Sequence, residues 1–220
     1  MIKHWFSPQI IKEFPDSKYN KDIKLIKSDV RQLGQFPMDA DWVIHAAANP
    51  DVRTHASNPL DTASVIVDGT MSVVKTAERL SRLKKLLYLS SGLVCGSQPT
   101  SEKGMAENAQ GAPAPEASFI YPNAKRFAEV ICSAARAQSR IPVLVARPFS
   151  FIGPYQSLDT PWAQTTFLSD ALHGHPIRVL GDGQVVLENI DSGTEWRCSQ
   201  RGQSDGYNLA GLGETCGSKF

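Results

Sequence analysis

The sequence lacks an excess of charge of either sign. Its 220 residues include 23 Lys plus Arg and 22 Asp plus Glu, so the formal net charge is +1. A near-neutral chain gives no electrostatic reason to bind nucleic acid or an anionic membrane. No apolar run approaches the ~20 residues that cross a bilayer, and the N-terminus lacks the apolar segment of a signal peptide. We therefore expect a soluble, cytoplasmic protein whose partners include neither nucleic acid nor a membrane.

Metal-binding patterns are also missing. The four cysteines, at positions 95, 132, 198 and 216, form no C-x-x-C pair, and no histidine cluster accompanies them. Because a structural zinc site needs closely spaced ligands of these types, we expect no metal. Cys95 falls at an expected strand end and Cys132 in an expected helix. Both are predicted to be buried thiols of a reduced compartment.

What the sequence does contain is an alternation of strand and helix patterns. With 41% hydrophobic residues it can bury a full core. Long segments with helical spacing predict helices at 61–83 and 121–138, and shorter ones at 7–14 and 165–172. Apolar runs predict strands at 23–26, 41–45, 86–89, 141–146 and 177–180. This alternation predicts an α/β fold with a parallel sheet and right-handed crossovers.

Several small or polar residues follow the expected strands directly. Asp29 follows the first, residues 46–48 (all Ala) the second, Ser90 the third and Pro148 the fourth. Because parallel sheets bind ligands at the carboxyl ends of their strands, we expect these segments to converge there. Asp29 suits hydrogen bonding to an adenine amino group, or else it only caps its own loop. The three alanines would let a dinucleotide approach the backbone, although they also fit an ordinary strand end.

A serine-ended strand is followed by a tyrosine and a lysine on one helix. Tyr121 and Lys125 are four residues apart, so one helix face presents both. A nearby ammonium lowers the pKa of a phenol, which would let Tyr121 take a proton from an alcohol as hydride leaves for NAD. Ser91 would hold the substrate oxygen. The alternative is a half-buried aromatic beside a solvated lysine, but the order of these motifs with Arg147 favours the proton relay.

Together these motifs resemble the extended short-chain dehydrogenase/reductase family, and within it the NAD-dependent epimerase/dehydratase group that acts on nucleotide sugars. The resemblance implies a Rossmann-type NAD domain, catalytic Ser91, Tyr121 and Lys125, and a homodimer formed through helices 61–83 and 121–138. The matching stretches are 28–31, 43–48, 68–70, 89–96, 121–125, 147–154 and 181–183. The resemblance further implies NAD contacts from Asp29, Val30, Ala46, Ala47, Ala48, Ser90, Lys125 and Pro148, and substrate contacts from Gly92, Phe149 and Ser150.

The departures from the family pattern are as informative. The family opens with a strand and a G-x-x-G-x-x-G turn that holds the cofactor pyrophosphate, and this sequence begins after that unit. Ile66, Cys95 and Leu187 replace the usual Asn, Tyr and Arg. We therefore expect a truncated Rossmann-like sheet that lacks its first β-α unit. Residues 1–150 would form the incomplete NAD-binding domain, and 151–220 a partial substrate domain that is poorly ordered after about 187.

The residues after the catalytic serine bear on the reaction. Dehydratases of the family carry Asp and Glu there, and its sugar-acid decarboxylases usually carry Glu where Leu93 stands. Neither Gly92 nor Leu93 can do acid–base work. The sequence therefore favours a nucleotide-sugar epimerase, or a reductase, that oxidises one sugar hydroxyl transiently. The alternatives are an inactive remnant without competent NAD binding and, more weakly, a binding protein.

Overall fold

The structure is a computed structural model. It describes residues 26, 28–33, 36–96, 111–148, 158–160, 162–177 and 179, together with the backbone of five short strands that lie outside these ranges. The expected helix at 7–14 and most of the expected strand at 23–26 lie outside the described residues. So does the chain after 187, for which poor order was expected, apart from three of those short strands.

A parallel sheet forms the centre of the fold. Its strands are β1 (Trp42–His45), β2 (Lys85–Leu89), β4 (Val143–Arg147) and β7 (Gly206–Asn208), hydrogen-bonded in the order β1-β2-β4-β7. All three pairings are parallel. The predicted α/β class and parallel sheet are therefore confirmed, and three of the strands match the runs expected at 41–45, 86–89 and 141–146.

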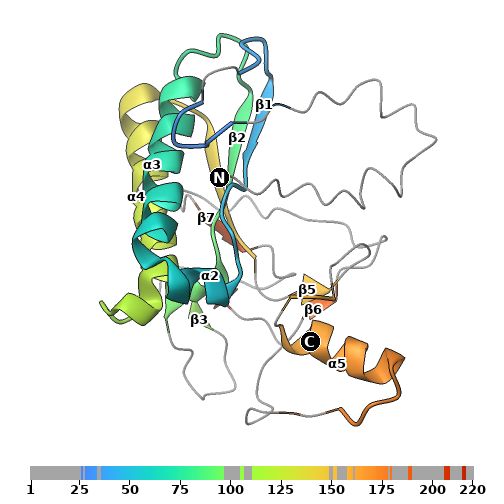
Figure 1. Cartoon of the computed structure of the whole chain (residues 1–220). Helices are drawn as coiled ribbons and strands as arrows, with labels where there is room; N and C mark the ends of the chain where they lie inside the picture. The colour runs from blue at the N-terminus through green and yellow to red at the C-terminus, as the bar shows by residue number, and fades with distance from the viewer. Residues whose placement is uncertain are drawn as a thin grey trace, which may run out of the picture.

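Two long helices lie side by side over one face of this sheet (Figure 1). They are α3 (Pro59–Ala77), which begins with proline in its first turn, and α4 (Ile120–Ser139), which ends at Arg140 in the left-handed conformation. The helix expected at 61–83 thus ends six residues early. Its basic end turns back toward the sheet instead, because the Lys84 amide donates to the Asp41 carbonyl at 2.7 Å.

The core fills the space between the sheet and these helices. Leu86, Tyr88, Val143 and Val145 point toward it from the strands, and Ala128 on α4 is fully buried there. The other face of the sheet is less covered. Trp42 and Ile44 of β1 are 66% and 68% exposed, and the alternating burial of β1 and β2 follows from the period of two along a strand.

Shorter elements complete the described chain. They are α2 (Val52–Ser57), α5 (Ala163–Leu172), the 3₁₀ turns η2 (Gly92–Cys95) and η3 (Ala117–Phe119), and the two-residue strands β3 (Met105–Ala106), β5 (Phe151–Ile152), β6 (Glu188–Asn189) and β8 (Thr215–Cys216). The helix predicted at 165–172 is confirmed as α5. The strand predicted at 177–180 is not found, since Ile177 and Val179 belong to no strand.

Two further observations concern the cysteines and the membrane. Cys132 is a free, buried thiol as predicted, whereas the prediction of a free thiol at Cys95 is wrong, because Cys95 is disulfide-bonded. Within the described part of the chain, no helix combines the length and the apolar character that crossing a bilayer requires.

Candidate active site

The carboxyl ends of three neighbouring strands meet at one edge of the sheet, as the sequence predicted. Ala46 follows β1, Ser90 follows β2 and Pro148 follows β4. Two backbone bonds continue the pairing of β2 and β4 beyond the strands, from the Ser90 amide to the Ala146 carbonyl at 2.7 Å and from the Gly92 amide to the Pro148 carbonyl at 2.9 Å. The backbone therefore places these segments together. Phe149 and Ser150 lie outside the described residues.

Lys125 is buried at this edge, on the face of α4 that packs against the sheet. Only 3% of the residue is exposed, and its Nζ donates a 2.6 Å hydrogen bond to the carbonyl of Leu89, the last residue of β2. Nζ also lies 5.1 Å from the ring centre of Tyr88. Burial lowers the pKa of Lys125 to about 8, against the opposing effect of Cys132 and the Glu129 carboxylate. The alternative of a solvated lysine is therefore wrong.

Tyr121 lies one helical turn before Lys125 on the same buried face. Its ring stacks on the imidazole of His55 with centres 4.3 Å apart, and the Lys125 Nζ is 5.7 Å from its centre. Burial raises the pKa of Tyr121 to about 12. The expected lowering of this pKa by Lys125 is not found, since the ammonium points to the Leu89 carbonyl. The pairing on one helix face is confirmed, whereas the proton relay stays a prediction.

His55 of α2 is also part of this site. It is buried, and its Nε2 lies 2.6 Å from the carbonyl oxygen of Asn49. Asp51 caps the start of α2 and so fixes the helix that carries His55. His45 of β1 is buried with Nε2 3.0 Å from the Thr70 hydroxyl, and burial lowers its pKa to about 3. No sequence pattern links His55 to Tyr121, so only the fold reveals their contact.

Ser91 begins the 3₁₀ turn η2. Its Oγ accepts a hydrogen bond from the Leu93 amide at 3.2 Å and so caps the turn, which leaves the hydroxyl hydrogen for another acceptor. Gly92 is buried directly behind it. The structure thus gives Ser91 a local structural task at the sheet edge. Its contact with a substrate oxygen stays a prediction.

A second polar cluster beside Lys125 was not predicted. The Glu129 carboxylate accepts hydrogen bonds from the Ser90 hydroxyl at 2.5 Å and from Arg147 Nε and Nη2 at 2.9 and 2.6 Å. We call these three residues the Glu129 clamp. The spacing of Tyr121, Lys125 and Glu129, each one helical turn after the last, could have indicated that Glu129 lies on the same helix face as the other two.

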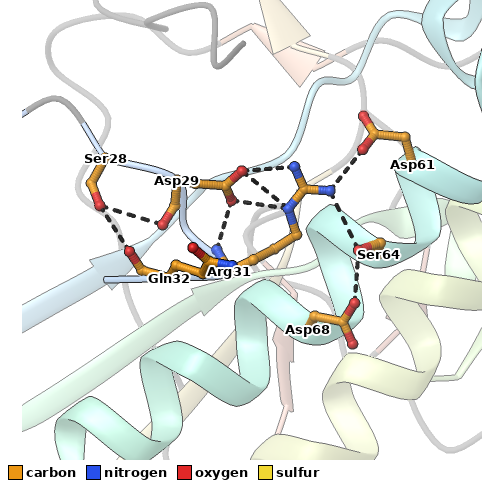
Figure 2. A network of polar contacts seen from close by, with 7 residues as sticks. All are labelled: Ser28, Asp29, Arg31, Gln32, Asp61, Ser64 and Asp68. Atoms are coloured by element: carbon orange, nitrogen blue, oxygen red, sulfur yellow. Dashed lines mark hydrogen bonds and ion pairs between the residues drawn. The ribbon is translucent and has the colours of Figure 1, made fainter. Parts of the chain in front are cut away.

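Asp29 lies in a loop that ion pairs join to α3. Its carboxylate accepts hydrogen bonds from Arg31 Nε at 3.0 Å and Nη2 at 2.7 Å, while Arg31 Nη1 reaches Asp61 at 2.7 Å (Figure 2). Arg31 holds the pKa of Asp29 below its ordinary value. Asp29 also accepts from the Arg31 amide at 2.9 Å, so it does cap its loop. Adenine binding by Asp29 stays a prediction.

Val30 fixes the same loop by packing. A Cβ atom added to Gly69 of α3 would lie 2.7 Å from Val30 Cγ1, closer than real contacts allow. The missing side chain of Gly69 therefore allows the loop that carries Val30 to pack closely against α3. Among the described residues, no group of three His, Cys, Asp or Glu side chains is arranged to hold a metal ion.

Comparisons with known proteins agree with this architecture. UDP-glucuronic acid decarboxylase 1 of Xenopus tropicalis is 28% identical over 83% of this chain and 39% of its own length. The UDP-glucuronic acid 4-epimerase of Bacillus cereus, solved with UDP-glucuronic acid and NAD, covers 79% of this chain and 52% of its own, at 22% identity and a TM-score of 0.63. Pal from Bacillus thuringiensis covers 83% and 58%, at 22% identity and a TM-score of 0.69.

The solved neighbours share the fold, and the chain spans about two fifths of the Xenopus relative. The match to the family model extends over residues 13–192. It includes strands β1, β2 and β4, both long helices, and Tyr121, Lys125 and the Glu129 clamp. The chain belongs to the NAD-dependent epimerase/dehydratase family.

Proposed function

We propose that this chain carries the proton-transfer and cofactor-binding edge of an NAD-dependent, epimerase-like enzyme acting on a nucleotide sugar. One observation supports this proposal more than any other. Tyr121 and Lys125 are buried on one face of α4, and Lys125 is bonded to the Leu89 carbonyl immediately before Ser90 and Ser91. Lysine is rarely fully buried unless its ammonium has a partner, because desolvation of the charge is costly.

The reaction would move one hydride and one proton. NAD, when bound, accepts the hydride from the sugar carbon that bears the reacting hydroxyl. The hydroxyl proton would pass to the Tyr121 phenolate, and the hydride and the proton would then return, with the hydride added to the opposite face of that carbon, to give the epimer. Burial alone raises the pKa of Tyr121 to about 12, so positive charge near the phenol is needed for this step. The Lys125 Nζ, 5.7 Å from the ring centre of Tyr121, would supply this charge once the phenol proton is lost.

The described residues fit the nicotinamide half of NAD. Ala46 and Ala47 are exposed at the end of β1, and their side chains, each a single methyl group, leave the backbone of that strand end open to a ligand. An ammonium has three hydrogens, and Lys125 gives one to Leu89. Lys125 would hold a ribose hydroxyl, with Ser90 and Pro148 beside it and Asp29 and Val30 toward the adenine.

The reaction class rests on Gly92 and Leu93. Neither side chain can exchange a proton, which favours epimerisation over decarboxylation or dehydration. The decarboxylase relatives point the other way, since they suggest a sugar acid as substrate and loss of its carboxylate. UDP-glucuronic acid serves both readings as a test substrate, because epimerisation conserves the carboxylate and decarboxylation releases CO₂.

Two assembly features belong to this proposal. The substrate domain would begin near residue 151. A homodimer would form through helices α3 and α4, whose outer faces expose Leu60, Met71, Phe127 and Val130. Light scattering of the purified chain tests the dimer, and Phe127→Glu on the exposed face of α4 should disrupt it.

The alternative is a family remnant without competent NAD binding. Calorimetric titration of the 220-residue chain with NAD, followed by turnover of UDP-glucuronic acid, separates the two. We expect weak NAD binding, turnover that Tyr121→Phe abolishes with NAD affinity nearly unchanged, and damage to both turnover and NAD affinity with Lys125→Ala. A chain that gives no heat with NAD favours the remnant, and an active Tyr121→Phe variant moves the proton transfer elsewhere.

A further inference from the structure

The Glu129 clamp joins three elements at one point. Glu129 is on α4, Ser90 follows β2 and Arg147 ends β4. Both oxygens of the carboxylate are engaged, one by Ser90 Oγ and Arg147 Nε and the other by Arg147 Nη2. The side chains of Arg147 and Glu129 are only 20% and 12% exposed. A single carboxylate therefore fixes the helix to the carboxyl ends of two adjacent strands.

The residues on either side of Ser90 connect the clamp to the proposed reacting groups. The residue before it, Leu89, offers the carbonyl that holds Lys125 Nζ at 2.6 Å, and the residue after it is Ser91. Lys125 also lies one helical turn before Glu129 on α4. A shift of Glu129 would consequently move Ser90, and with it both the lysine acceptor and the proposed substrate-binding serine.

We propose that Glu129 is a positioning residue, which acts through Ser90 and Lys125 to hold the reacting groups of this site in register. The kinetic part of this inference rests on the proposed function. The structural part does not, because it rests only on the clamp and on the bond from Lys125 to Leu89. The competing explanation is an ion pair that only stabilises the fold.

Electrostatics provides the readout that separates these explanations. The Glu129 carboxylate favours the charged form of Lys125, while burial opposes it and lowers its pKa to about 8. Other groups facing Lys125 are Tyr88 from β2, His45 from β1, and Tyr121 and Cys132 from α4. The pKa of Lys125 therefore depends on both the charge and the distance of Glu129.

The experiment compares Glu129→Gln with wild type. Lysine labelled with ¹³C at Cε is followed by NMR during a pH titration of the whole chain, with the Lys125 signal assigned through Lys125→Arg. We expect Glu129→Gln to move the pKa of Lys125 downward, since a stabilising negative charge is lost. Turnover should fall about a hundredfold in kcat with little change in KM, and the alkaline loss of activity should begin at a lower pH.

The matched control is Arg136→Met. Arg136 also ties α4 to β4, through a 2.9 Å bond from Nη1 to the Val143 carbonyl, but at the far end of the strand. This variant should lose stability while kcat stays at the wild-type value. The pKa of Lys125 should not move downward. If Glu129→Gln behaves in the same way, with Lys125 titrating as in wild type, the positioning role is wrong.

Two further arms keep the test decisive. If Glu129→Gln does not fold, Glu129→Asp keeps the charge but shortens the reach by one methylene. It should lower kcat while moving the Lys125 pKa less than loss of the charge would, and wild-type kcat in Glu129→Asp would overturn the proposal. If wild type itself shows no turnover, the proposed function fails, and the Lys125 titration alone decides whether Glu129 acts on the lysine.

Discussion

The loop network around Arg31 and the Glu129 clamp contain the same chemical contact in different surroundings. In each, an arginine donates side-chain hydrogen bonds from Nε and Nη2 to one carboxylate. The shortest N–O distance is 2.7 Å between Arg31 and Asp29 and 2.6 Å between Arg147 and Glu129. The Arg31 and Asp29 side chains are 28% and 31% exposed, and Asp61 is 64% exposed. In the clamp, Arg147 and Glu129 are 20% and 12% exposed. Two ion pairs with nearly the same N–O distance therefore need not contribute equally to the free energy of unfolding.

The two regions differ in what water can replace. Exposed ion pairs contribute little, because water and salt screen them and two long side chains must be ordered. A buried partner that loses its counter-charge cannot recover the lost interaction from water. Around Asp29, the packing of Val30 on Gly69 fixes the loop together with the ion pairs visible in Figure 2. At the clamp, the charges themselves hold the strand ends.

The largest expected effect comes from breaking the clamp. Glu129→Ala leaves the Arg147 guanidinium largely buried beside a cavity and frees the Ser90 hydroxyl. We expect a loss of about 3 kcal/mol in the free energy of unfolding, the lower end of the range for broken buried pairs. Urea unfolding measures this loss. A change below about 1 kcal/mol would place the clamp in the same energetic class as the loop network.

The second prediction is a gain in the free energy of unfolding rather than a loss. Lys125 is a buried charge whose pKa in the folded protein, about 8, lies below its ordinary value of 10.5. Between these pH values the unfolded chain binds more protons, so wild-type stability should rise with pH across that window. Lys125→Met should therefore be more stable than wild type at pH 7, by on the order of 2 kcal/mol, and inactive.

Urea unfolding of both proteins at several pH values checks this. The advantage of Lys125→Met should shrink steadily as pH rises from about 8 toward 10.5, because the native wild-type lysine is then already neutral. A constant difference across the range would mean that the ammonium of Lys125 is well solvated or paired in the folded chain. Above pH 10 the buried phenol of Tyr121 acts in the other direction, so the window ends there.

The sequence predicts the regular elements of the fold better than the contacts between distant segments. Local periodicity was sufficient for the strands at 41–45, 86–89 and 141–146 and for α4, since burial on one side leaves a repeat in the sequence. The rule that parallel strands present their carboxyl ends together then placed Ala46, Ser90 and Pro148 at one edge.

Contacts between distant segments left no such repeat. After α3 ends at Ala77, the Lys84 amide bonds to the Asp41 carbonyl, and His55 stacks on Tyr121; both contacts join residues far apart in the chain. The direction of the Lys125 side chain was also missed. Its i+4 spacing predicted a contact with Tyr121, whereas the Leu89 carbonyl competes for the same ammonium.

The third prediction examines how packing holds the loop. Gly69→Ala gains about 1 kcal/mol of helix propensity but pushes its methyl group against Val30, a crowding that costs roughly 1–3 kcal/mol. We expect a net loss of about 1 kcal/mol by thermal unfolding. With Val30→Ala present, the clashing Cγ1 is absent, so Gly69→Ala should become stabilising. The same sign in both backgrounds would show that Val30 does not limit this glycine.

The smallest expected effect comes from the loop ion pairs. Arg31→Met removes the contacts to Asp29 and Asp61 together and keeps the apolar part of the side chain. We expect a loss of about 0.5 kcal/mol at low salt, which should vanish near 1 M salt, where the screening length falls to about 3 Å. The Glu129→Ala loss should persist at the same salt concentration, because the clamp is shielded from mobile ions.

A pH series sharpens the same comparison. Arg31 lowers the pKa of Asp29 in the folded protein, so this pair contributes stability above the ordinary pKa of the carboxyl and loses it as the pH falls below about 4. Arg31→Met should remove that acid dependence, and urea unfolding between pH 3 and 7 measures it. A loss from Arg31→Met that resisted both salt and acid would mean that the loop pairs, like the clamp, are effectively withdrawn from water.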